Sequence, residues 1–131
     1  MRLLLDTHVL IWMALEPERL SRRAARELDR TVAERWISPL SIWELVNLRE
    51  KGRFAIQEPT GVWLEKTMMR ASLREAPLSL EIALATEQAA LPHSDPIDRL
   101  LVATARLLDL TLVTADQRLI EAAKCRILEA R

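Results

Sequence analysis

Short continuous apolar runs alternate along the chain with longer stretches in which apolar residues recur at helical spacing. The runs from Leu3 to Leu5 and from Leu110 to Thr114 are typical of strands buried on both faces of a parallel sheet. Weaker strand patterns lie at 35–38, 74–80 and 125–128. Pro77 has no backbone N–H for a sheet ladder, so the strand at 74–80 is expected at an edge.

Helical spacing fills the segments between these strands. The clearest helix is expected from Pro96 to Asp109, and the next from Ser21, whose hydroxyl can cap it. In that second helix the apolar positions recur every four residues, at Leu20, Ala24, Leu28 and Val32. Further helices are expected at 9–15, 41–51, 59–72 and 81–91, with a short one after 116. This alternation predicts an α/β fold with a central parallel sheet of about four to five strands, order 3-2-1-4-5, and helices on both faces.

Length and composition predict one ordered domain over residues 1–131. Half of the residues are apolar and only two are glycine, which is typical of a packed, helix-rich protein. Lys+Arg and Asp+Glu balance at 19 each, so nucleic-acid binding would require a local basic patch.

The cysteine content and the hydropathy bear on the compartment. The single Cys125 has no partner for an internal disulfide, which favours a reducing compartment. No apolar run approaches the ~18 residues of a membrane span, and Asp6 and His8 interrupt the run at 3–15 that resembles a signal-peptide core. We therefore expect a cytoplasmic protein with no membrane segment.

Four segments place an acid just after a predicted strand or early in the following helix, at Asp6, Glu44, Asp98 and Asp116. Three of these acids also have an ordinary structural interpretation. Ser41-x-x-Glu44 fits a capping box, Asp95-Pro96-x-Asp98 fits an N-cap, and Asp116 fits a cap of the last helix. Asp6 is harder to explain in this way, because it directly follows an apolar strand.

The predicted topology brings the four acids together. If the second strand pairs on one side of the first and the fourth on the other, a crevice opens at the carboxyl ends of the first and fourth strands. Carboxylates gathered there raise one another's pKa values, and a divalent cation would compensate their charge. Oxygen ligands with few histidines favour Mg²⁺ or Mn²⁺ over zinc. Such a site suits phosphodiester hydrolysis, because divalent ions activate water and stabilise the leaving oxygen.

At these positions the chain resembles the PIN-domain ribonucleases, and among them the VapC-type toxins of type II toxin–antitoxin systems. The resemblance spans nearly the whole chain in four segments: Leu5-Asp6-Thr7-His8, Ser38-Pro39-Leu40-Ser41-Ile42-Trp43-Glu44, His93-Ser94-Asp95-Pro96-Ile97-Asp98-Arg99-Leu100-Leu101 and Leu112-Val113-Thr114-Ala115-Asp116.

The resemblance implies a Mg²⁺- or Mn²⁺-dependent endoribonuclease toxin that leaves 5′-phosphate and 3′-hydroxyl ends. It implies that the metal ligands are Asp6, Glu44, Asp98 and Asp116. Thr114, and secondarily Thr7, would orient the site by hydrogen bonding, and Asp95 would cap or support it. The resemblance also implies a homodimer and a cognate VapB-like antitoxin that wraps a hydrophobic groove and blocks the site.

Several other polar residues have two interpretations. His8 and His93 are expected as helix-start or supporting polar groups, with contact to substrate as the alternative. Arg99 either meets a phosphate or pairs with a neighbouring carboxylate. The cluster of Arg49, Lys51 and Arg53 stabilises a helix end beside Gly52, with contact to the RNA backbone as the alternative.

The large apolar side chains are assigned mainly to the core. Trp36, Trp43 and Trp63 are expected in the core, and the Met68-Met69 pair is expected to fill core gaps. Trp12 lies on short elements, which leaves partial exposure and a role in an antitoxin or dimer surface open.

Two other function classes remain open. One is a phosphatase with Asp6 as covalent nucleophile, which is disfavoured because position 8 is histidine and lysines are few. The other is a non-catalytic, PIN-like or receiver-like module whose acids bind metal for regulation. The balanced charge supports this second alternative, since RNA enzymes often present a basic surface, whereas the presence of all four acids speaks against it.

Overall fold

The computed structural model describes residues 1–93 and 95–131 and contains a five-stranded parallel sheet. The strands are β1 (Arg2–Leu5), β2 (Glu34–Ile37), β3 (Leu73–Glu75), β4 (Thr111–Thr114) and β5 (Ile127–Glu129). Their order in the sheet is β3-β2-β1-β4-β5. The predicted α/β class and the strand order 3-2-1-4-5 are therefore confirmed.

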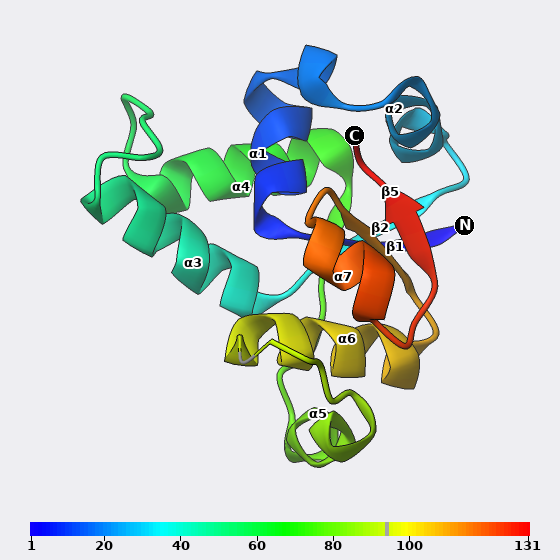
Figure 1. Ribbon diagram of the computed structural model, residues 1–131. Coiled ribbons are helices and arrows are strands. Elements are labelled where there is room, and N and C mark those ends of the chain that lie inside the picture. Colours follow the sequence, from blue (N-terminus) through cyan, green and yellow to red (C-terminus); the bar gives the residue numbers. More distant parts are fainter. Residues whose placement is uncertain (94) are drawn as a thin grey trace.

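Helices connect the strands and cover both faces of the sheet (Figure 1). They are α1 (Thr7–Leu15), α2 (Arg22–Asp29), α3 (Pro39–Glu50), α4 (Thr60–Ala71), α5 (Leu80–Ala85), α6 (Pro96–Leu108) and α7 (Gln117–Ala122), with single 3₁₀ turns η1 (Pro17–Arg19) and η2 (Thr86–Gln88). Within the described residues no helix is both long enough and apolar enough to cross a membrane.

The sheet divides the core into two layers. Successive side chains of a strand point to opposite faces, so Leu3 and Leu5 join the layer under α1 to α4, whereas Leu4 joins the layer under α5 to α7. All three leucines are fully buried. This burial explains the unbroken apolar run of β1, because neither face of the central strand meets water.

Several element ends differ from the sequence prediction. Helix α3 begins at Pro39 because Ser38 caps it, accepting a hydrogen bond from the Leu40 N–H at 3.2 Å, so the expected capping box at 41–44 is wrong. Helix α5 ends at Ala85 instead of continuing to Leu91. The Thr86 carbonyl that follows accepts a hydrogen bond from Arg99 Nε at 2.9 Å.

Two further ends differ. Strand β3 is an edge strand as expected, but it ends at Glu75, before Pro77. Helix α2 ends at Asp29, which leaves Val32 73% exposed instead of on the predicted apolar face. Ser94, which belongs to one of the quoted segments, lies outside the described residues.

One tryptophan expected in the core is exposed, and Trp12, whose exposure was left open, is buried. Trp63 is buried as expected, but Trp43 is 58% exposed because the buried Leu45 sets the inward face of α3. Trp12 is only 6% exposed because it packs in the core layer under α1 to α4. The guanidinium groups of Arg19 and Arg131 lie 5.0 and 5.8 Å from the centroid of its ring.

Of the other apolar side chains expected in the core, Met68 and Trp36 pack against it and Met69 does not. Met68 packs against the core, whereas Met69 of the expected core pair is exposed. Trp36 is half-buried against the second core layer, between the guanidinium groups of Arg2 and Arg74.

Candidate active site

Asp6 lies at the junction of the two central strands. It follows β1 directly, and its backbone N–H donates to the Val113 carbonyl of β4 at 3.0 Å. Its side chain caps α1, with Oδ1 accepting from the Thr7 N–H at 2.8 Å. Because β2 and β4 flank β1 on opposite sides, Asp6 occupies the point in the sheet where ligands bind in open α/β folds.

Thr114 joins Asp6 to Asp116. The Thr114 hydroxyl is fully buried, donates to Asp6 Oδ2 at 2.7 Å and accepts from the Asp116 N–H at 3.1 Å. One side chain at the end of β4 therefore fixes the orientation of one acid and the backbone of another. The Thr7 hydroxyl has a different contact, since it donates to the Ser41 carbonyl at 3.5 Å and links α1 to α3.

Asp98 lies in the first turn of α6, where Asp95 is the N-cap. Asp95 Oδ1 accepts from the Ile97 and Asp98 N–H groups at 2.9 and 3.3 Å, which positions this turn. Asp98 is buried, and its Oδ2 lies 2.9 Å from His93 Nε2. His93 therefore supports Asp98, as expected of a supporting polar group.

The four predicted ligands influence one another electrostatically. Burial raises the pKa of Asp98 to about 6, with further contributions from Asp95, Asp6 and Asp116, while His93 opposes the shift. Burial also raises the pKa of Asp6, against its hydrogen bonds from Thr114 and Thr7, and the charge of Glu44 on α3 adds to the increase. The acid that follows β1, Glu44 of α3, Asp98 of α6 and the acid that follows β4 are therefore electrostatically coupled.

Arg118 occupies part of this edge and was not singled out in the sequence. Its side chain holds both oxygens of Asp116, with Nε 3.4 Å from Oδ1 and Nη2 3.1 Å from Oδ2. These contacts lower the pKa of Asp116. Arg118 lies two residues after the N-cap of α7, so its role could be recognised only once Asp116 was known to be that cap.

The donor set is chemically suited to a hard divalent cation, because all four predicted ligands are carboxylates. Two of them have raised pKa values, and a cation would relieve the unfavourable ionisation. In the arrangement seen, however, no three His, Cys, Asp or Glu side chains among residues 1–93 and 95–131 are placed to hold one metal ion.

The remaining polar candidates have structural contacts. His8 is exposed in the first turn of α1, beside Trp12. Arg99 donates to the Thr86 carbonyl and forms no ion pair within the described residues. Arg49 donates to Thr60 Oγ1 at 2.8 Å, linking α3 to α4.

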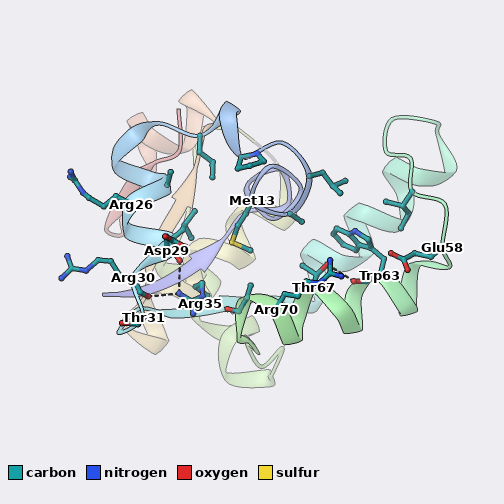
Figure 2. A pocket seen from close by; sticks show the side chains of 18 of the residues that line it. Met13, Arg26, Asp29, Arg30, Thr31, Arg35, Glu58, Trp63, Thr67 and Arg70 are labelled. Carbon is teal, nitrogen blue, oxygen red and sulfur yellow. Dashed lines mark hydrogen bonds between the residues drawn. The ribbon is translucent and has the colours of Figure 1, made fainter.

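A large groove of about 1330 Å³ lies apart from the acids. It is bounded by the end of α1, by α2, by residues 55–58 and by α4, and none of the four predicted ligands lines it. Figure 2 shows Met13 and Trp63 among the lining side chains, together with Arg26 of α2 and Arg30, which directly follows α2. The charged lining residues are Arg26, Asp29, Arg30, Arg35, Glu58 and Arg70.

Comparison with known proteins places this arrangement in a family. Residues 3–124 match the PIN domain family model. The chain is 35% identical over 119 residues to Ribonuclease VapC22 of Mycobacterium tuberculosis, which covers 88% of each protein.

Solved structures of VapBC complexes have a fold similar to that of this chain. VapBC2 from Rickettsia felis, bound to a DNA fragment from its promoter, superposes with a TM-score of 0.72 at 15% identity, covering 100% of both chains. VapBC-1 from nontypeable Haemophilus influenzae gives a TM-score of 0.61 at 14% identity, covering 98% of each chain. The chain therefore belongs to the PIN domain family and is a homologue of the VapC-type ribonuclease toxins.

Proposed function

We propose that this protein is a divalent-cation-dependent endoribonuclease toxin of the VapC type, acting in the cytoplasm. The observation that carries the proposal is the electrostatic coupling that links Asp6 to three acids from other segments of the chain, in a chain homologous to a ribonuclease over most of its length. These acids are Glu44, Asp98 and Asp116. Two of these acids, Asp6 and Asp98, have raised pKa values, and perturbed pKa values cluster at functional sites.

The residues that would hold Mg²⁺ or Mn²⁺ are Asp6, Glu44, Asp98 and Asp116. When bound, the cation supplies the Lewis-acid chemistry that lowers the pKa of water and stabilises charge on phosphate oxygens. The chain itself orients the ligands: Thr114 holds Asp6 and the backbone of Asp116, and His93 holds Asp98. Hydrolysis by water would leave a 5′-phosphate and a 3′-hydroxyl.

The direct test is cleavage of single-stranded RNA with mapped ends, with and without Mg²⁺ or Mn²⁺. Asp98→Asn should abolish metal-dependent cleavage. Asp109→Asn is the matched control, because Asp109 is exposed at the other end of the same helix and should cut as the wild type does. Normal cleavage by Asp98→Asn would show that the site is assigned wrongly.

A non-catalytic metal-binding module is the second candidate. The balanced charge, with Lys+Arg and Asp+Glu at 19 each, favours it, because RNA enzymes often present a basic surface. Metal binding by calorimetry without cleavage of any fraction of total RNA would support this alternative over the nuclease.

The proposed inhibitor is a VapB-like antitoxin whose extended segment occupies the groove between α2 and α4. VapBC and FitAB complexes are among the structures with this fold. Among the charged lining residues, four arginines outnumber two acids, so the segment should combine apolar and acidic side chains. Arg26→Glu/Arg30→Glu should weaken complex formation in a co-purification assay, because both exposed arginines line the groove. The matched control Arg22→Glu/Arg23→Glu makes the same change of charge at the start of α2, outside the groove, and should bind as the wild type does.

We also propose a homodimer. The described surface carries exposed apolar side chains on α3 and α5, including Trp43, Leu80 and Leu84, the last two 86% and 69% exposed. Apolar side chains this exposed are typical of interaction surfaces. Light scattering of Leu80→Glu/Leu84→Glu should report a monomer, and an unchanged dimer would exclude this surface.

A further inference from the structure

Arg118 is the only cation with a described ion pair to two of the proposed ligands. Its Nη2 lies 3.1 Å from Asp116 Oδ2 and 4.0 Å from Asp98 Oδ2. The backbone N–H of Arg118 also donates to Asp116 Oδ1 at 2.9 Å. The guanidinium therefore faces oxygens on two elements, α6 and the start of α7, that a shared divalent ion would need.

All described polar contacts of the Arg118 side chain are with Asp116 and Asp98, and the rest of the side chain faces solvent. Its side chain is 60% exposed, while those of Asp116 and Asp98 are 28% and 10% exposed. Every described hydrogen bond and ion pair of this side chain goes to these two carboxylates. It can thus leave toward solvent without breaking any other described contact.

We propose that Arg118 is an internal counter-cation that occupies Asp116 and Asp98 in the metal-free protein and is displaced when a divalent ion binds. This inference rests on the proposed metal site. It accounts for the orientation of Asp116 in a site where no three of the described His, Cys, Asp or Glu side chains are arranged around one ion. With both oxygens of Asp116 held by Arg118, that ligand is not available for shared coordination.

The cost of displacement should be small, because ion pairs of exposed arginines are weak. Removing the competitor should therefore tighten divalent-ion binding by about two- to fivefold, which is the range expected for losing one such pair. A bidentate arginine pair lies at the upper end of this range. Because the gain comes from freeing Asp116, it should require the Asp116 carboxylate.

Calorimetric titration with Mn²⁺ tests this inference without any activity measurement. The variants are Arg118→Gln and the matched control Arg99→Gln, which removes the same charge next to Asp98 from a side chain with no described ion pair. Asp116→Asn and the double variant Asp116→Asn/Arg118→Gln complete a double-mutant cycle. Circular dichroism of each variant checks that the fold is retained.

We expect Arg118→Gln to bind Mn²⁺ about two- to fivefold more tightly than the wild type. Arg99→Gln should change the Mn²⁺ affinity by less than about twofold. In the Asp116→Asn background, the gain from Arg118→Gln should vanish. Unchanged or weaker binding by Arg118→Gln, or an equal gain in Arg99→Gln, would overturn the counter-cation role while leaving the metal site intact. If no variant binds Mn²⁺, both this inference and the metal-dependent function fail.

Discussion

Replacing Asp98 with asparagine should make the metal-free protein more stable at neutral pH, although it removes a proposed metal ligand. Burial raises the pKa of this carboxyl from 3.8 to about 6, with the charges of Asp95, Asp6 and Asp116 adding to the shift. Ionised Asp98 is therefore unfavourable in the folded state. Asparagine has a similar shape and can still accept a hydrogen bond from His93, but it carries no charge.

The magnitude follows from linkage between protonation and folding. A pKa near 6 instead of 3.8 corresponds to about 3 kcal/mol of unfavourable free energy in the ionised folded state, and screening by water reduces this to about 1–2 kcal/mol. Between about pH 4 and pH 6 the folded state binds more protons at Asp98 than the unfolded state does. The stability of the wild type should therefore fall as pH rises through this window.

Urea unfolding in the presence of a chelator measures this effect directly. At pH 7, Asp98→Asn should be about 1–2 kcal/mol more stable than the wild type, and the two should converge below about pH 3, where Asp98 is protonated in both states. Asp109→Asn, at the exposed end of α6, should show no such pH-dependent gain. A variant less stable than the wild type at pH 7, or a difference independent of pH, would refute the reasoning.

Three further predictions concern stability. Thr114→Val removes the hydrogen bond to Asp6 and should lower the free energy of unfolding in urea by about 1–3 kcal/mol, whereas Thr114→Ser should remain near the wild type. Equal stability of Thr114→Val and the wild type would show that this hydrogen bond contributes nothing. In the same assay, Trp63→Ala should lower the free energy of unfolding by about 3–5 kcal/mol and Trp43→Ala by less than about 0.5 kcal/mol. A larger loss for Trp43→Ala than for Trp63→Ala would contradict the burial of Trp63. Ser38→Ala should lower thermal stability by about 1 kcal/mol through loss of the α3 cap, which an unchanged melting temperature would contradict.

The sheet and the positions of the acids could be predicted because the signals are local and strong. Three leucines followed by Asp6 indicate a central strand that ends at a polar site, and the alternation of strands and helices fixes parallel pairing. The strand order then determines that Asp6 and Asp116 lie at neighbouring strand ends. These steps depend only on the period of the pattern and on the handedness of the connections.

The orientation of single side chains on helices could not be predicted in the same way. On α3, a rotation by one residue decides whether Trp43 or Leu45 is buried, and both choices fit the apolar pattern. Trp12 is covered by Arg19 and by Arg131, which is more than a hundred positions away in the chain. No signal in the sequence indicated Arg118, because its contacts with Asp116 depend on the geometry at the N-cap of α7.

The most direct test of the central claim is the anomalous scattering of Mn²⁺ in crystals of the wild-type protein. The proposed site predicts a peak within about 2.0–2.4 Å of oxygens from Asp6, Asp98 and Asp116, with Glu44 as a ligand directly or through water. The Arg118 side chain should have moved away from Asp116. Crystals that show no peak at a saturating Mn²⁺ concentration, or a peak remote from these carboxylates, would contradict the claim that the four acids form a metal centre.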